Sequence, residues 1–144
     1  RTRMAIEDNG ELIVLAPALK EFGEDKEIDR LIRKYGYLGT PHTLKACDEN
    51  EELRNNLSAA AHLIHGSSEG RFSITYCPGK GAENLTQTEI ENVGFKYADI
   101  DEVTAKYDPA KLRDGYNIMP DGEEIFYISN PALGLWAFKD RFRY

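Results

Sequence analysis

The sequence is poor in the residues that build cross-links and metal centres. It has two cysteines and three histidines among its 144 residues. Two cysteines cannot make the disulfide framework that stabilises small secreted domains. Nothing in the sequence resembles a signal peptide, and no apolar run approaches the roughly 18 residues of a membrane helix. We therefore expect a cytoplasmic protein with no membrane partner.

Basic residues are also scarce relative to acidic ones. The chain has 18 Lys and Arg against 25 Asp and Glu, which gives a net charge of −7 at pH 7. Binding to the phosphates of nucleic acids or to anionic lipids needs a positively charged surface. The charge balance therefore argues against a nucleic-acid partner and favours solubility.

The spacing of the histidines and cysteines does not match a metal site. The chain contains no Cys-x-x-Cys and no His-x-x-x-His, the spacings typical of zinc ligands. On one continuous helix in phase with Leu53, Leu57 would lie within about 40° of the core face and His62 about 180° from it. A nucleophile pair of His42 with Cys47 lacks a third residue to orient it. We interpret His62 and His65 as surface residues, with a site converging from separate segments as the alternative.

The cysteines have a simple interpretation of their own. Cys47 stands near an expected helix start, and Cys77 stands near the end of an expected strand. Free cysteines of this kind usually behave as small buried hydrophobes. We therefore expect no metal bound by this chain.

Strands and helices are predicted to alternate along the chain. The apolar run Leu12 to Ala16 predicts a central parallel strand that is buried on both faces. Asp48 and Thr86 each begin a capping-box pattern, and the first predicts one long helix that ends at Gly66. Further strands are expected at 71–78, 95–98 and 123–129, and further helices after Asp25 and Asp101.

This alternation predicts an α/β fold. Right-handed βαβ crossovers would give a Rossmann-like three-layer domain, with a mostly parallel sheet of four or more strands and helices on both faces. A chain of this length suits one domain, so residues 1–144 are expected to form a single domain. Because the chain opens at Arg1 without an initiator methionine, we expect a fragment of a longer protein.

Two polar loops are candidates for ligand binding. The first follows the most apolar strand and contains Lys20, Glu21 and Gly23. Ligands of open parallel sheets bind at the carboxyl ends of the strands, so these residues are predicted to contact a substrate carboxylate or hydroxyl. The second, Gly-Thr-Pro-His-Thr-Leu-Lys, offers His42 and Lys45 as second choices. The alternative is that both segments are ordinary connections.

The end of the chain is rich in aromatic residues. Four of them fall within nine positions: Trp136, Phe138, Phe142 and Tyr144. An exposed cluster of this kind would promote association. We expect it to pack on this domain, on a missing part of the protein, or on a second subunit in a homo-oligomer.

The order of these segments resembles the C-terminal domain of the nickel-dependent lactate racemase family. The resemblance rests on Asn9-Gly10, the apolar strand Leu12 to Ala16, the loop Gly23-Glu24 and the late turn Pro120-Asp121-Gly122. These short motifs follow one another in the family's order over most of the chain.

The resemblance implies a two-domain enzyme with its active site between the domains. Members invert the C2 centre of a 2-hydroxy acid by passing the α-hydrogen as hydride to a nickel pincer nucleotide, while a histidine takes the hydroxyl proton. The lysine, the histidines and the nickel ligands would belong to the N-terminal catalytic domain, which would be the partner of this chain. No catalytic residue and no cofactor is then expected within residues 1–144.

One departure from the family concerns the substrate. Lactate-type members carry a tryptophan near the start of the long helix, where this chain has Asn55, Asn56 and Leu57. This difference favours a sugar acid such as mannonate or gluconate over lactate. The alternative function is a stand-alone Rossmann-like binding or interaction module without catalytic activity, with the aromatic tail as its docking surface.

Overall fold

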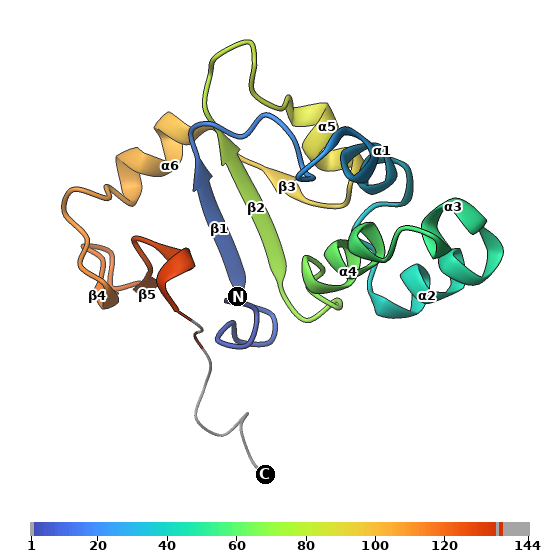
Figure 1. Cartoon of the computed structure of the whole chain (residues 1–144). Helices are drawn as coiled ribbons and strands as arrows, with labels where there is room; N and C mark the ends of the chain where they lie inside the picture. Colours follow the sequence, from blue (N-terminus) through green and yellow to red (C-terminus); the bar gives the residue numbers. More distant parts are fainter. Residues whose placement is uncertain (1, 135, 137–144) are drawn as a thin grey trace. The chain divides into compact units, whose positions relative to one another are not determined.

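The computed structural model describes residues 2–134 and residue 136 (Figure 1). The chain divides into two compact units, of which one comprises Glu7–Ile100 and the other comprises Arg1–Ile6 with Asp101–Tyr144. It is a mixed α/β protein with a three-stranded parallel sheet and a two-stranded antiparallel sheet. None of the described helices is long and apolar enough to cross a membrane.

The larger unit holds the parallel sheet and most of the helices. In chain order its elements are β1 (Glu11–Ala16), α1 (Lys26–Tyr35), α2 (Thr40–Glu49), α3 (Glu51–Arg54), α4 (Leu57–His65), β2 (Ser73–Pro78), α5 (Gln87–Asn92) and β3 (Lys96–Tyr97). The expected alternation of strands and helices is confirmed here. Two of the expected caps are confirmed as well: Asp25 accepts from the Ile28 amide at 2.8 Å, and Thr86 forms a capping box with Glu89.

β1 is not the central strand that its apolar sequence predicts. The sheet order is β1-β2-β3, and within the described residues β1 pairs only with β2, with Leu12 beside Ile74. The side chains from Leu12 to Ala16 are half-buried, whereas β2 is mostly buried. An apolar run indicates that a strand is to be covered, but it does not say how many strands pair with it.

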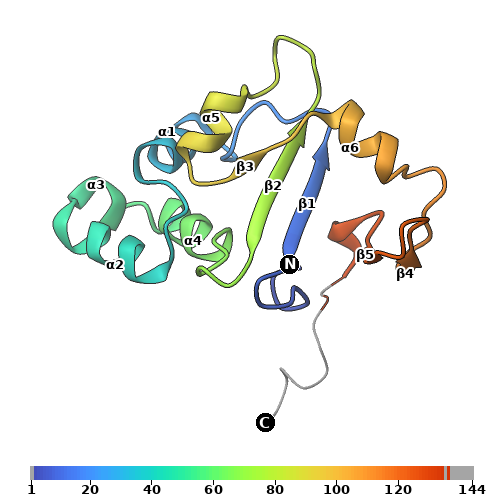
Figure 2. The ribbon, with the colours of Figure 1, turned by 180° about the vertical axis from the view of Figure 1, so that it is seen from behind.

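The described helices of this unit pack on one face of the sheet. Two right-handed crossovers that step in the same direction, from β1 to β2 to β3, place their helices on the same side. Arg33 of α1 and Glu89 of α5 are joined accordingly by an ion pair at 2.6 Å. Figures 1 and 2 show α1, α4 and α5 grouped together from both directions. This unit therefore has two layers.

The predicted long helix from Asp48 to Gly66 is wrong. Asp48 lies inside α2, and the chain then forms the short α3 and the separate α4. Asn56 begins α4 by accepting a hydrogen bond from the Ala59 amide at 3.0 Å. This break shifts the helical phase, so Leu57, expected in the core, is 74% exposed.

The core of this unit includes apolar side chains from four of its helices, α1, α3, α4 and α5. Leu31, Leu53, Leu63 and Ile90 are fully buried. At roughly 1.5–3 kcal/mol per side chain, their burial is a main source of stability for the unit.

The predicted strand at 123–129 does not join the parallel sheet. In the smaller unit, α6 (Ile100–Lys106) precedes the hairpin of β4 (Gly115–Ile118) and β5 (Glu124–Tyr127), and the 3-10 helix η1 (Pro131–Leu133) follows. The turn Pro120-Asp121-Gly122 joins the two strands directly, with Gly122 at φ +88°. A connection this short can make only an antiparallel pair, because parallel strands need a long crossover. The expected parallel sheet of four or more strands therefore has three among the described residues.

The hairpin turn is tied to α6 by polar contacts. Lys106 pairs with Glu123 at 2.8 Å and with Asp121 at 3.5 Å, and the Tyr107 hydroxyl donates to Glu123 at 2.7 Å. Asp114 accepts from the amide and hydroxyl of Ser129 at 2.7 and 2.8 Å at the open end of the hairpin. The hairpin is thus fixed at both ends.

Candidate functional site

The carboxyl ends of the three parallel strands carry the candidate site. The loop from Pro17 to Asp25 follows β1, the loop from Gly79 to Leu85 follows β2, and Ala98 and Asp99 follow β3. Figure 1 shows the first two loops side by side at the heads of the β1 and β2 arrows. This is the edge at which open parallel sheets bind their ligands.

Two of these loops are in direct contact. The Leu85 amide donates to the Leu19 carbonyl at 2.8 Å, and the Gly79 amide donates to Ala16 at 3.3 Å. A Cβ atom at Gly79 would lie 2.1 Å from the Pro17 carbonyl oxygen. Only a glycine therefore allows the loops to approach this closely.

The charged residues of this edge differ in their partners. Lys80 pairs with Asp99 at 3.3 Å, so the loops after β2 and β3 are joined. Lys20 and Glu21 are both exposed, and neither takes part in an ion pair among the residues that the structure describes. Lys20 is therefore a cation at the carboxyl edge that is available to an anionic ligand.

Gly23, predicted to approach a substrate, approaches a helix instead. A Cβ atom on Gly23 would lie 2.6 Å from the Asp29 amide nitrogen and 2.7 Å from Ile28 Cγ2. The Asp29 carboxylate accepts from the Phe22 amide at 2.7 Å and is held by Arg33 at 2.6 Å. The loop after β1 is thus folded against α1, which fixes the position of the residues just before it.

His42 and Lys45 lie at the opposite end of the strands. Both are exposed on α2, and Lys45 faces Glu49 at 3.8 Å. The start of α2 is bound by Glu69, whose carboxylate accepts from the Thr40 amide at 3.0 Å. Because Glu69 belongs to the segment that leads into β2, this contact places α2 near the amino ends of the strands. The structure therefore does not bring His42 or Lys45 to the site of Lys20.

His62 is half-buried rather than turned away from the core. Its Nδ1 lies 3.0 Å from the Tyr37 hydroxyl, and the Tyr37 ring stacks on Phe95 with centroids 4.5 Å apart. Burial raises the pKa of the Tyr37 phenol. The surface interpretation of His62 was wrong because it assumed one continuous helix; His65 is exposed, as expected.

The described residues do not bring together three or more His, Cys, Asp or Glu side chains in a way that could hold a metal ion. Cys77 is fully buried in β2, and burial raises the pKa of its thiol. Cys47 is half-buried on α2 rather than fully buried.

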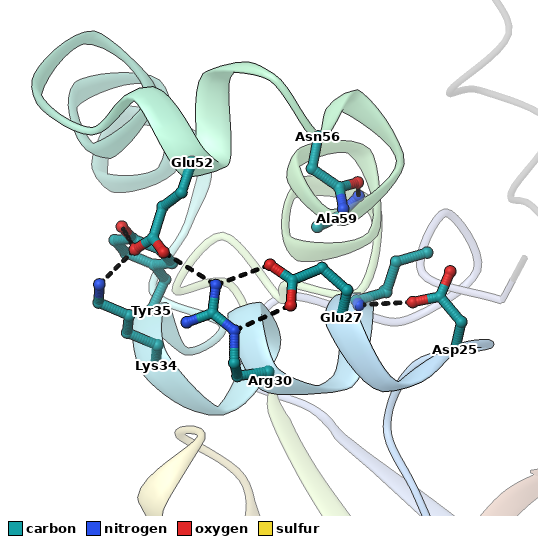
Figure 3. Close-up of polar contacts among 9 residues, drawn as sticks. Asp25, Glu27, Arg30, Lys34, Tyr35, Glu52, Asn56 and Ala59 are labelled. Atoms are coloured by element: carbon teal, nitrogen blue, oxygen red, sulfur yellow. Dashed lines mark hydrogen bonds and ion pairs between the residues drawn. The ribbon is translucent and has the colours of Figure 1, made fainter.

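A polar network connects α1, the helix that follows the candidate loop, with α3 (Figure 3). Glu52 of α3 accepts hydrogen bonds from Lys34, from Arg30 at 2.8 Å and from the Tyr35 hydroxyl at 2.7 Å. These donors, Lys34 first, lower the pKa of Glu52 to about 2. Figure 3 also shows the caps Asp25 and Asn56 at neighbouring ends of α1 and α4. The network fixes α3 to the helix that follows the candidate loop.

Sequence reasoning missed the contribution of the loop after β2. Pro78-Gly79-Lys80-Gly81 follows the second expected strand just as the Lys20 loop follows the first. The same rule for carboxyl edges would have selected Lys80. The aromatic tail lies mostly outside the described residues: Trp136 is half-buried, whereas Phe138, Phe142 and Tyr144 are not described.

The fold and its carboxyl edge define the class of the molecule, an α/β protein with a parallel sheet. Neither the models of known families nor the curated proteins with which the sequence was compared give a match. A crystal structure of a protein from Thermotoga maritima is similar, with a TM-score of 0.53 and 20% sequence identity over 77% of this chain and 26% of that chain. This likeness shows the fold alone. The chain spans about a quarter of the length of the Thermotoga protein.

Proposed function

We propose that this chain is the C-terminal domain of a cytoplasmic racemase or epimerase of the nickel-dependent lactate racemase family. The reaction would invert the C2 centre of a 2-hydroxy acid, and the substrate would be a sugar acid such as mannonate or gluconate. The resemblance in sequence supports this proposal, and so does the likeness in fold to part of a longer protein, of which the match covers 26%.

The observation that carries the proposal is the exposed Lys20 at the carboxyl edge of the sheet. A free lysine at this place suits the carboxylate that all 2-hydroxy acids share. Glu21, also exposed, is suited to accept hydrogen bonds from the additional hydroxyls of a sugar acid. Gly23 would act indirectly, because it lets the loop fold against α1 and so positions both side chains.

Binding of the nickel pincer nucleotide would be the task of the N-terminal catalytic domain. The described residues of this chain do not fit a nickel site, since they form no cluster of suitable ligands. We therefore assign no catalytic step to them. Their proposed role is to bind and orient the substrate on one side of the cleft.

A three-layer, Rossmann-like arrangement of the sheet is part of this proposal. In a Rossmann-like sheet with helices on both faces, strands such as β1 are covered on each side. The helices of Glu7–Ile100 pack on one face of the sheet, and β1 has a free edge within the described chain. We place β1–β3 in a three-layer arrangement that other parts of the intact protein would complete.

The test is the exchange of Lys20→Ala in the intact enzyme, measured by the interconversion of gluconate and mannonate at C2. Loss of a charged hydrogen bond of about 1.5–3 kcal/mol predicts a fall in kcat/KM of roughly 10- to 100-fold, mainly through KM. Lys26→Ala removes another exposed lysine from the same region and should leave both constants unchanged. Equal kinetics for wild type and Lys20→Ala would refute the binding role.

The alternative is an interaction module without catalytic activity. The exposed apolar face of the β4–β5 hairpin favours it, since Ile118 is 78% exposed. The gene upstream of Arg1 discriminates between the two functions. A coding region for several hundred residues with a His- and Lys-bearing domain supports the enzyme, whereas a start codon near Arg1 supports the module.

A further inference from the structure

One face of the β4–β5 hairpin is exposed and mostly apolar. Tyr116 and Phe126 stand opposite each other, with ring centroids 5.0 Å apart at 88°, and Ile118 stands opposite Glu124. Tyr116 is 55% exposed, Phe126 48% and Ile118 78%. A monomeric protein rarely leaves this much contiguous apolar surface uncovered, and an isolated two-stranded sheet is only marginally stable.

The charges around this face have opposite signs at its two ends. Arg113 lies before the Tyr116–Phe126 pair along the hairpin, and Glu124 lies beyond it. Together with Lys111 they border a shallow groove over Tyr116 and Ile118. Neither Arg113 nor Glu124 takes part in an ion pair among the described residues, whereas Lys111 faces Asp108 at 3.5 Å.

This arrangement is complementary to itself. Two copies can place these faces against each other around a two-fold axis that lies in the interface and is perpendicular to the strands. The hairpins of the two copies are then antiparallel. Arg113 of one copy then meets Glu124 of the second copy, and the same pair forms again on the other side of the axis. The aromatic pair of each copy meets the aromatic pair of the other at the centre, where tyrosine and phenylalanine are enriched in interfaces.

We propose that the exposed face of β4–β5 is a homodimer interface and that its occupant is the same face of a second copy of this chain. The two hairpins form a small sandwich of two sheets, spaced by about 10 Å as in other packed sheets. Arg113 and Glu124 set the antiparallel orientation, and Ile118, the most exposed of the three apolar side chains, becomes buried. This interface does not depend on the racemase proposal.

Sedimentation velocity over a concentration series tests the interface in the intact protein. The wild-type protein should sediment as a dimer, and Ile118→Lys as a monomer, with the dimer dissociation constant raised at least about 100-fold by a buried charge. Leu57→Lys is the matched control, since Leu57 is 74% exposed but belongs to α4. It should leave the dimer unchanged.

Charge reversal tests the orientation. Arg113→Glu and Glu124→Arg should each weaken the dimer about tenfold, because each change breaks a pair that the symmetry repeats. The double variant restores both pairs and should return within about threefold of the wild type. Circular dichroism checks that every variant keeps its fold, which the exposure of these residues predicts.

Two outcomes overturn the proposal. One is a wild-type protein that stays monomeric up to about 100 μM, a range that includes weak specific dimers. The other is a dimer that survives Ile118→Lys, or a double variant no better than either single variant, because another surface would then hold the copies together.

Discussion

Replacing Gly79 by alanine should separate the two loops that form the carboxyl edge. A Cβ atom at this position would lie 2.1 Å from the Pro17 carbonyl oxygen and 2.9 Å from its carbonyl carbon, where ordinary contacts begin at 3.4 Å. Both atoms are backbone, so no side chain can rotate away. The loops must move apart by more than 1 Å.

This movement affects two hydrogen bonds. The Gly79–Ala16 bond is already 3.3 Å long, and the Leu85–Leu19 bond at 2.8 Å joins the same loops. Overpacking costs about 1–3 kcal/mol, and each bond lost adds about 1 kcal/mol. We expect Gly79→Ala to lower the free energy of unfolding by about 2–4 kcal/mol, measured by urea denaturation followed by circular dichroism.

Gly70→Ala is the control for this experiment. Gly70 has φ +71° but no atom within 4 Å of its added Cβ, so the change brings strain without a clash and should cost about 1 kcal/mol. Under the proposed function, Gly79→Ala should also raise the KM of the intact enzyme, because Lys20 directly follows the displaced Leu19. A Gly79→Ala protein as stable as Gly70→Ala would show that the loop contact contributes nothing.

Three further substitutions test other parts of the structure. Leu63→Ala should lower the free energy of unfolding in urea by about 2–5 kcal/mol because Leu63 is fully buried, whereas Leu57→Ala should change it by no more than about 0.5 kcal/mol. A larger loss for Leu57→Ala than for Leu63→Ala would support the continuous helix instead of the break. Glu69→Ala should lower the free energy of unfolding by about 1 kcal/mol, and Glu69→Gln by less, since an amide oxygen can still accept from the Thr40 amide. Unchanged stability in both variants would show that this hydrogen bond does not stabilise the start of α2. Glu52 has its pKa lowered to about 2, so its stabilisation is complete above the unfolded value of 4.5 and is lost as the pH falls towards 2. The stability difference between wild type and Glu52→Gln should therefore shrink over that range.

The sequence predicts the elements of this fold better than their assembly. The caps at Asp25 and Thr86 are local hydrogen bonds between neighbouring residues, and both are present. The break at Asn55 and Asn56 was missed because apolar residues continue at helical spacing on both sides of it. One break changed the predicted environment of Leu57 and His62, since a helical wheel carries any phase error to every later residue.

The place of Lys20 at the carboxyl edge could be predicted because its loop directly follows a recognisable strand, and position relative to a strand end can be read from the sequence. Its role in binding a ligand stays a prediction. Whether His42 joins it depends on which end of the sheet α2 approaches. That is decided by the contact of Thr40 with Glu69, 29 residues away, which no local pattern reveals.

The position of β1 connects the fold to the proposed function. Leu12 to Ala16 form an unbroken apolar strand, and such strands occur mainly in sheets covered on both faces. The helices of Glu7–Ile100 lie on one face, and the five apolar residues remain half-buried. A strand of this composition that is left half-covered at a sheet edge is a place for further packing. Its apolar sequence therefore supports the proposal that other parts of an intact protein would complete the sheet.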